Sequence, residues 1–319
     1  MEFFQIVSYA LLFLLLFFLI RLVYPFIYLN YFVRSQNLQE KYDATWALIT
    51  GSSSGLGLIL AERLAKQKIN LLLLSNDLES LRSQCLTLRK NYPAIKVESM
   101  CIDMSQPAET FIQSIEGELQ KKPISLLFNN VGYMPVFNFA SSEWNQVESH
   151  INCTVTNTIQ LTHTVVNSLY KRKGIGAIVF TSSIMSFIPA PYSALYSSSK
   201  SYISAFAQSL AIETKKYNID VCVVQPGPIS KTNFLKATGI DNFDKDPFVR
   251  LLYSFSQTPK QIINLMLNSI GKFTVVDSSP LWGLVRAFQL VCGENIILYI
   301  LTKTSTLWGL GRSLKKKSN

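Results

Sequence analysis

The sequence predicts an α/β fold in which a doubly wound parallel sheet carries helices on both faces. Short apolar runs typical of buried strands alternate with helical patterns along most of the chain. Parallel strands need such alternation, because a helix must return the chain between them. A glycine-rich segment follows the first run, and both ends of the chain are more apolar than the middle. We therefore expect one large α/β domain at about 41–280, flanked by separate segments at 1–40 and 281–319.

Composition sets this chain apart from an average soluble enzyme. Of its 319 residues 48% are hydrophobic and only 16% are charged, and the formal net charge is +10. Without a nucleic-acid motif, this charge favours an anionic membrane surface or an anionic substrate over nucleic acid. The five cysteines are scattered without a CxxC pair, which indicates reduced thiols. His150 and His163 form no metal-binding spacing, so we expect no metal.

The first forty residues predict a membrane anchor and a connector. Phe3–Ile20 is an almost unbroken apolar stretch, close to the ~20 residues that span a hydrocarbon core. It lacks the basic start and the small-residue cleavage site of a removed signal peptide. Arg21, Arg34 and Lys41 follow it, and this positive-inside bias places the α/β domain in the cytosol. A monotopic anchor that does not cross the bilayer is the alternative.

The first strand is expected at Trp46–Thr50, and the segment TGSSSGLG follows at Thr50–Gly57. A helical pattern then runs over about 58–67. Strand, glycine-rich turn and helix in this order form a cradle for a dinucleotide, because the glycines let the backbone approach the pyrophosphate and the helix N-terminus favours its charge. The candidate cofactor-binding residues here are Gly51, Ser53, Ser54, Gly55, Leu56 and Gly57.

The next two strand-like runs, at 69–74 and 95–101, are expected to carry the adenosine end of the cofactor. Ser75 and Asn76 follow the first run, and Asp103 follows the second, where its carboxylate can hydrogen-bond the adenine. No arginine or lysine stands beside Asn76 or in the glycine-rich segment to meet a 2′-phosphate. No acidic residue stands at Ser75 to favour an unphosphorylated ribose. These residues leave both NADP(H) and NAD(H) open.

A fourth strand at Ile124–Phe128 leads into Asn129-Asn130-Val131-Gly132. Asparagine and glycine tolerate left-handed backbone, so this segment predicts a turn at the end of the strand. We expect Asn130 and Gly132 to pack beside the adenosine half of the cofactor.

Ser183, Tyr196 and Lys200 form the candidate catalytic group, after a fifth strand at 177–181. A tyrosine and a lysine four residues apart on a helix share one face. An ammonium beside a phenol favours the phenolate, so Tyr196 can exchange its proton nearer neutrality than its usual pKa of ~10. Ser183 can hold a substrate oxygen alongside. This combination suits hydride transfer to or from a carbonyl.

The remaining elements complete and cover the sheet. A sixth strand near 220–224 precedes Pro226 and Gly227, which we place beside the cofactor. Residues 228–257 show little regular pattern and are interpreted as a flap over the substrate. The segment 272–276 is a candidate final strand.

The C-terminal part predicts membrane association. Leu281–Leu310 is rich in Leu, Ile, Trp and Phe but contains Arg286, Glu294 and Lys303, which favours an amphipathic segment on the bilayer over a second span. Three roles stay open for it: a route for a lipid substrate, a dimer surface or a cover for the core. The end, Lys315–Asn319, matches the dilysine signal for retrieval to the endoplasmic reticulum, or is a solvated basic tail near anionic lipid.

The order and spacing of these motifs resemble the short-chain dehydrogenase/reductase family over about residues 45–235. The resemblance implies a Rossmann fold and a hydride passed between a nicotinamide and a carbonyl or alcohol carbon. It implies Tyr196 as proton donor and acceptor, and Ser183 as the residue that orients the substrate oxygen. Lys200 would bind the nicotinamide ribose and lower the Tyr196 pKa. The matching pieces are TGSSSGLG, Asp103, NNVG, Ser183, Tyr196 with Lys200, and Pro226-Gly227.

The family also implies an asparagine that anchors a proton-relay water. We expect this residue to be Asn152, on a helix that begins near Ser142. The segment between Asn152 and Thr162 is two residues longer than the usual pattern, so Asn157 is the alternative, and a helix irregularity would absorb the difference. Asn152 also begins a glycosylation sequon, which we discount because it lies in the active-site helix of a cytosolic domain.

Within the family, the chain is similar to the membrane-bound 17β-hydroxysteroid dehydrogenase and very-long-chain 3-oxoacyl-CoA reductase group. The apolar N-terminus, the dilysine tail, Ile188–Pro191 and the helix after Lys200 carry this similarity, whereas TGSSSGLG and the missing base near Asn76 depart from it. The group implies NADPH-dependent reduction of a 3-oxoacyl-CoA in fatty-acid elongation at the endoplasmic reticulum, with elongation-complex partners. Family members dimerise through long helices, here near 143–171 and 192–216. A 17-ketosteroid, 3-ketosphinganine, or a catalytically weak membrane-bound scaffold are the alternatives.

Overall fold

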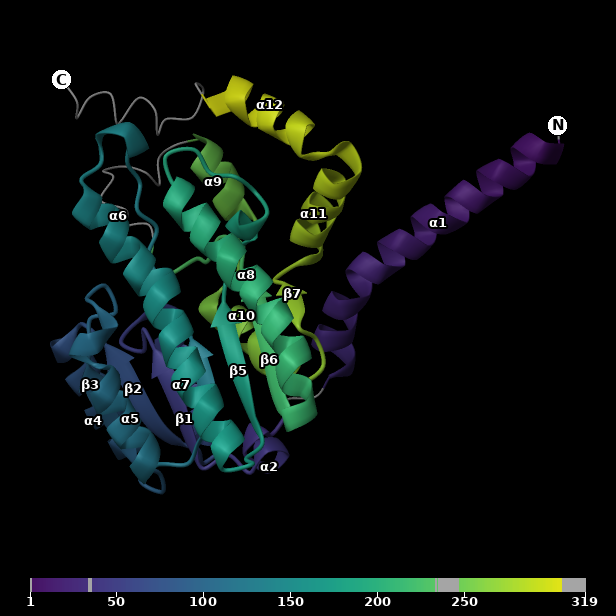
Figure 1. Cartoon of the computed structure of the whole chain (residues 1–319). Helices are drawn as coiled ribbons and strands as arrows, with labels where there is room; N and C mark the ends of the chain where they lie inside the picture. Colours follow the sequence, from purple (N-terminus) through teal and green to yellow (C-terminus); the bar gives the residue numbers. More distant parts are fainter. Residues whose placement is uncertain (1, 34–35, 233, 235–246, 306–319) are drawn as a thin grey trace.

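The computed structural model describes residues 2–33, 36–232, 234 and 247–305. Within these residues, seven parallel strands form one sheet in the order β3-β2-β1-β4-β5-β6-β7 (Figure 1). The order reverses between β1 and β4, which in open α/β sheets opens a crevice for ligands beyond the strand ends. The doubly wound parallel sheet is thus confirmed. The strands are β1 (Trp46–Thr50), β2 (Asn70–Ser75), β3 (Val97–Cys101), β4 (Ile124–Asn129), β5 (Gly176–Thr181), β6 (Ile219–Gln225) and β7 (Val275–Asp277).

Two helical layers bury the two faces of this sheet. One hydrophobic cluster joins Leu60, Leu81 and Ile262 of the first layer to one set of strand residues, and a second joins Ile115, Leu161 and Ile203 of the second layer to the alternate set. Because both faces are covered, the central strands read as continuous apolar runs. The first layer contains α3 (Gly55–Lys66), α4 (Leu78–Asn91) and α10 (Pro259–Ser269), and the second contains α5 (Ile112–Lys121), α7 (Asn157–Lys171) and α8 (Ala194–Thr214).

A π-helical turn interrupts the long helix before β5. The helix begins as α6 (Trp144–Ile151), continues as the π-helix Asn152–Thr156, and resumes as α7. This turn is a helix irregularity of the kind that could absorb the two-residue excess before Thr162. The helix starts at Trp144, close to the expected start near Ser142, and Glu143 is its N-cap residue.

The N-terminal helix α1 (Glu2–Ile27) extends away from the body, and its side chains from Phe3 to Phe17 are exposed (Figure 1). The connector after it belongs to the domain, since Leu29 and Leu38 are buried in the first core cluster. The short helix α2 (Leu38–Tyr42) is held there by Tyr42, whose hydroxyl donates a 2.7 Å hydrogen bond to Asp220 of β6.

Two consecutive helices follow β7, namely α11 (Pro280–Cys292) and α12 (Glu294–Ser305), with a bend of 109° between them. Among the described residues, no single helix has both the length and the apolar composition of a bilayer span. The pair α11 and α12 reaches that composition only when taken together. The predicted N-terminal span is therefore not confirmed. Lys315–Asn319 lies outside the described residues.

The segment interpreted as an irregular flap contains a helix, α9 (Pro247–Ser254). The sequence pattern did not reveal this short helix, and the role of the segment as a flap stays a prediction. Val249 is buried against Met134 and Tyr196, whereas Leu251 is exposed, so only one face of α9 covers the domain.

Candidate active site

A cavity of about 670 Å³ lies at the carboxyl ends of the strands, around the β1/β4 reversal point. It brings together predicted residues from many parts of the chain. Gly57 and Asn152 are not among the lining residues. The predicted residues that line it are Gly51, Ser53, Ser54, Gly55, Leu56, Ser75, Asn76, Asp103, Asn130, Gly132, Ser183, Tyr196, Lys200, Pro226 and Gly227.

The glycine-rich turn shapes one wall of this cavity. Gly51 and Gly55 have φ angles of +61° and +55°, which residues with a side chain rarely adopt. A Cβ on Gly57 would fall 2.1 Å from the Gly51 carbonyl oxygen. The backbone of the turn therefore packs directly against Gly57, where a side chain would not fit. The helix α3 begins at Gly55 and directs its N-terminus toward the cavity. This geometry fits a dinucleotide pyrophosphate, as the sequence predicted.

The adenosine end is polar but carries no positive charge. The Ser53 and Ser75 hydroxyls share a 2.7 Å hydrogen bond, and the Asp103 carboxylate accepts one of 2.9 Å from the Ser105 amide. Lys200 is the one basic side chain among the described residues that line the cavity. The polar lining at this end therefore consists of neutral hydroxyls, the Asn76 amide and the Asp103 carboxylate.

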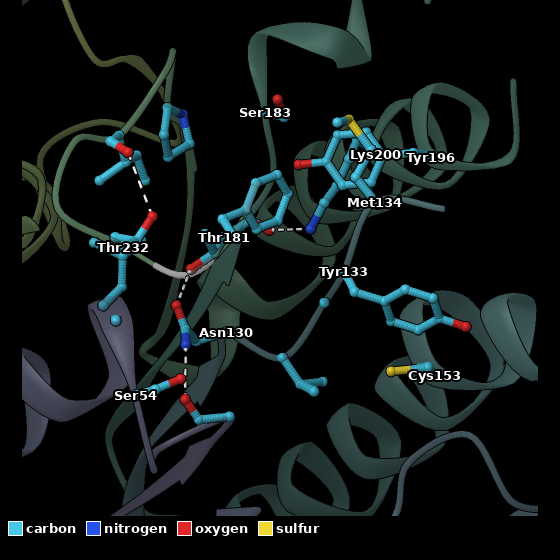
Figure 2. A pocket seen from close by; sticks show the side chains of 18 of the residues that line it. Ser54, Asn130, Tyr133, Met134, Cys153, Thr181, Ser183, Tyr196, Lys200 and Thr232 are labelled. Atoms are coloured by element: carbon cyan, nitrogen blue, oxygen red, sulfur yellow. Dashed lines mark hydrogen bonds between the residues drawn. The ribbon is translucent and has the colours of Figure 1, made fainter. Parts of the chain in front are cut away.

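Asn130 ties together the strands at the reversal point (Figure 2). Its backbone amide donates to the Thr50 hydroxyl at 3.0 Å, and its side-chain amide donates to the Gly51 carbonyl at 3.3 Å. Its side-chain oxygen accepts a 3.1 Å hydrogen bond from the Thr181 hydroxyl. These bonds join the ends of β1, β4 and β5, so the shape of the cavity depends on Asn130.

The three candidate catalytic residues meet at the end of β5 (Figure 2). Tyr196 and Lys200 lie on α8 and are buried, and Ser183 follows β5. The Lys200 ammonium donates a 2.8 Å hydrogen bond to the Thr181 carbonyl and lies 5.5 Å from the centre of the Tyr196 ring. The Ser182 hydroxyl donates a 3.0 Å bond to the Lys200 carbonyl, which fixes α8 against the strand.

Burial controls the ionisation of this pair. It raises the pKa of Tyr196 to about 12, and the hydrogen bond with the Ser183 hydroxyl opposes that rise. Burial also lowers the pKa of Lys200 to about 8. The family resemblance implied that Lys200 lowers the Tyr196 pKa, but in this structure removal of the phenol from water has the larger effect.

The asparagine expected to anchor a relay water lies elsewhere. Asn152 donates its side-chain amide to the Ser105 carbonyl at 3.4 Å, and Asn157 donates to the Met104 and Gln106 carbonyls at 2.7 Å each. Neither residue lines the cavity. Both hold the chain that follows β3, so the structure does not bring Asn152 or its alternative to the catalytic group.

Thr154, in the π-helical turn, packs against Gly132 beside Lys200, although it too is absent from the cavity lining. A Cβ built on Gly132 would lie 3.3 Å from the Lys200 ammonium and 3.9 Å from the Thr154 methyl, so both side chains pack against Gly132. The Thr154 hydroxyl donates a 2.7 Å hydrogen bond to the His150 carbonyl. The sequence held a signal for this position, because removing the two-residue excess before Thr162 points to Thr154 rather than Asn152.

The substrate half of the cavity is apolar. Met134, Val249 and Tyr196 form a buried cluster, with Met185 and Phe234 packed against it. The rings of Phe234 and Tyr196 lie 5.9 Å apart. The Ser183 and Tyr196 hydroxyls and the Lys200 ammonium are polar groups that line the cavity beside this cluster. Sequence reasoning missed the apolar wall because its residues come from five separate segments.

The loop after β6 lines the cavity and also contacts α11 through Gly227. A Cβ on Gly227 would fall 2.1 Å from the indole nitrogen of Trp282, which is buried at the start of that helix. The Gly227 amide donates a 3.0 Å hydrogen bond to the Ser278 hydroxyl. The loop after β6 therefore packs directly against the base of α11.

A comparison with protein families agrees with this geometry. The family model described as short chain dehydrogenase matches residues 45–242. The chain belongs to the short-chain dehydrogenase family. As a short-chain dehydrogenase it is an oxidoreductase whose fold binds a nicotinamide dinucleotide.

Several curated relatives carry the name very-long-chain 3-oxoacyl-CoA reductase. The Schizosaccharomyces pombe protein is 30% identical to this short-chain dehydrogenase over 261 residues, which cover 77% of this chain and 71% of that protein. The Podospora anserina protein is 29% identical, with coverage of 76% and 68%. The Mycosarcoma maydis protein is 26% identical, and the match covers 74% of this chain but only 64% of that relative.

Solved structures share the fold of this short-chain dehydrogenase. A 7beta-hydroxysteroid dehydrogenase aligns with a TM-score of 0.72 and 21% identity, over 84% of this chain and all of the other. A short-chain dehydrogenase from Sphingobium yanoikuyae aligns with a TM-score of 0.66 and 24% identity, over 80% of this chain and 94% of that one. At such identities the likeness concerns the fold alone.

Proposed function

We propose that this short-chain dehydrogenase reduces the ketone of a long-chain 3-oxoacyl-CoA, with NADPH as the reductant. The observation that carries the proposal is the substrate half of the cavity, which is apolar up to the Ser183 and Tyr196 hydroxyls. Such a wall fits a ketone on a hydrocarbon chain. The names of the curated relatives support the same substrate class.

In this mechanism the chain's own residues hold the ketone and supply the proton. Bound NADPH would provide the hydride that reduces the carbonyl carbon. The Ser183 hydroxyl would donate a hydrogen bond to the ketone oxygen and keep it beside Tyr196. Tyr196 would transfer its phenolic proton to that oxygen, giving the alcohol and a tyrosinate. The Lys200 ammonium would stabilise the tyrosinate until a solvent proton restores the phenol.

The choice of NADPH over NADH is part of the proposal. The Ser53 and Ser75 hydroxyls and the Asn76 amide are the donors that would meet a 2′-phosphate, because the lining has no cation at that end. Neutral donors hold a phosphate less firmly than an arginine does. We therefore expect a modest preference for NADPH over NADH.

We also propose that the protein works at the cytosolic face of the endoplasmic reticulum membrane. The exposed apolar side chains of α1 and the net charge of +10 support attachment to an anionic bilayer. The basic run Lys315–Lys317 would favour the same anionic surface. A homodimer through the long helices α7 and α8, and partners of a fatty-acid elongation complex, are parts of the same proposal.

Turnover by the detergent-solubilised protein tests the function. NADPH and NADH oxidation would be followed with a long-chain 3-oxoacyl-CoA, a 17-ketosteroid and 3-ketosphinganine. We expect turnover of the acyl-CoA with NADPH, and its loss by at least 10³-fold in Tyr196→Phe, because the proton donor is removed.

The melting temperature and the dinucleotide affinity of Tyr196→Phe serve as controls. If both match the wild-type values, the loss of turnover is not due to unfolding or to loss of cofactor binding. Turnover of only the steroid or the sphingoid ketone would replace the substrate and keep the mechanism. Tight cofactor binding without oxidation of any ketone would contradict the proposal and favour a scaffold.

A further inference from the structure

A second cavity lies beside the active site, between α8 and the bend formed by α11 and α12. We call it the elbow groove. Its volume is about 960 Å³. One wall comes from the turn after Ser183 and the first half of α8, and the other comes from α11 and α12. In Figure 1 α11 stands beside α8, and α12 turns back from the bend across the top of the domain.

The walls of the elbow groove are mainly hydrocarbon. Phe187, Pro189 and Leu290 are among its lining residues, together with Leu298 further along α12. Its lining holds two charged residues, Arg286 and Glu294. The Arg286 guanidinium is already engaged, because it donates a 2.6 Å hydrogen bond to Asp277 and lies 4.4 Å over the Phe187 ring. Glu294 begins α12, at the bend between the two helices, and most of the remaining wall suits an uncharged chain.

Met185 lines both cavities. It lies two residues after Ser183, and it packs against the cluster that contains Tyr196. The two cavities therefore adjoin at this residue, close to the reaction centre. Methionine is unbranched and adapts its shape, so it can move aside for a chain that passes from one cavity into the other.

The opposite side of the same two helices is exposed and apolar. Phe288, Val291 and Tyr299 are 54%, 76% and 64% exposed. Exposed apolar surfaces of this kind mark contacts with membranes or other hydrophobic partners. The helix α1, also exposed and apolar, packs against α11. The two helices that wall the elbow groove therefore also carry exposed apolar surface.

We propose that the elbow groove holds the hydrocarbon chain of the substrate while its ketone lies at Ser183 and Tyr196. The chain enters sideways from the lipid surface between α8 and α12 and passes Met185 to reach the reaction centre. This inference rests on the proposed function for the identity of the head group. The position of the chain is a separate claim, which can be tested without turnover.

Photo-crosslinking tests the position of the chain directly. The full-length protein in phosphatidylcholine vesicles would be irradiated with an eighteen-carbon acyl-CoA that carries a diazirine at the end of its chain. We expect crosslinked peptides from 185–201 and 286–302, and competition by unlabelled acyl-CoA. Crosslinks confined to 247–257, or spread without competition, would overturn the assignment. Because no reduction is needed, this result stands even where 3-oxoacyl-CoA is not a substrate.

A matched pair of tryptophan variants tests the consequence for catalysis. Leu290 lines the groove and Val291 does not, yet the two are neighbours on α11 and are 73% and 76% exposed. We expect Leu290→Trp to raise the KM for an eighteen-carbon 3-oxoacyl-CoA by at least tenfold and to leave a six-carbon substrate within twofold. Val291→Trp should leave both unchanged.

The outcomes separate this inference from the proposed function. If Leu290→Trp raises the KM for the six-carbon and the eighteen-carbon substrate by the same factor, with an unchanged melting temperature, the groove is not the site of the chain. An unchanged KM for the long chain would overturn this inference too. Absence of turnover with either chain in the wild type would contradict the proposed function, and the crosslinks would then decide the groove alone.

Discussion

Tyr196 and Lys200 share one buried helix face, but burial shifts their pKa values in opposite directions. The phenol holds its proton more firmly than usual, and the ammonium loses its proton more readily. Reduction needs a protonated Tyr196 to donate and a charged Lys200 to stabilise the tyrosinate. Both conditions are met together only below the pKa of Lys200.

This pairing predicts the pH dependence of reduction. The pKa of Tyr196 is about 12, so the phenol stays protonated across the accessible range, whereas Lys200, with a pKa of about 8, loses its charge as pH rises. The kcat/KM for the ketone should be flat below pH 8 and should fall about tenfold per pH unit above it. Lys200→Arg, whose cation persists, should lose this decline while keeping some activity. A decline that persists in Lys200→Arg would assign it to another group.

The adenosine end gives a prediction about cofactor choice. Asn76 lines the cavity where a 2′-phosphate would lie, with neutral hydroxyls beside it. Asn76→Arg should lower the KM for NADPH by about tenfold through a charge-assisted hydrogen bond worth about 1.5 kcal/mol, with little change for NADH. Steady-state kinetics with both dinucleotides measure this. An equal change in the KM values for NADPH and NADH would show that the side chain at position 76 does not contact the 2′-phosphate.

The catalytic Ser, Tyr and Lys could be predicted at the residue scale because local spacing brings them together. Lys200 follows Tyr196 by one helical turn, and Ser183 ends the neighbouring strand. The residue that packs against Gly132 beside Lys200 was not predicted. The expectation was Asn152, whereas Thr154, within the π-helical turn Asn152–Thr156, lies there, and only a count back from Thr162 points to it.

At the element scale, the junction between β1 and α3 depends on close backbone packing. A Cβ at Gly57 would overlap the Gly51 carbonyl, and the residues between them form the dinucleotide wall. The strand and the helix can therefore meet at this angle only when position 57 has no side chain.

Replacing this glycine should damage the cofactor site. Gly57→Ala should weaken dinucleotide binding by at least tenfold, because the turn must shift to accept the methyl group. Gly117, inside α5, has no atom within 4 Å of its Cβ position and is a control. Gly117→Ala should stabilise the protein by roughly 1 kcal/mol, as expected for a helix interior. Titration by fluorescence and thermal unfolding measure the two effects; equal affinity in Gly57→Ala would refute the packing argument.

For the whole molecule, the sequence predicted the sheet and its order of motifs well. Each expected strand lies within a few residues of the observed one, because buried parallel strands are short apolar runs that local composition reveals. The helix α9 and the bend between α11 and α12 could not be predicted in the same way. Their positions depend on contacts with distant segments, such as Val249 with Tyr196 and Trp282 with Gly227.

The contact of Trp282 with Gly227 has a thermodynamic consequence. The indole occupies the space that a side chain at Gly227 would need, so α11 cannot change its position without moving the loop beside the dinucleotide cavity. Two binding events on opposite sides of such a contact are linked, and linkage is reciprocal. If a lipid surface fixes α11, it changes the affinity for the dinucleotide by some factor. The dinucleotide must then change the affinity of the protein for that surface by the same factor.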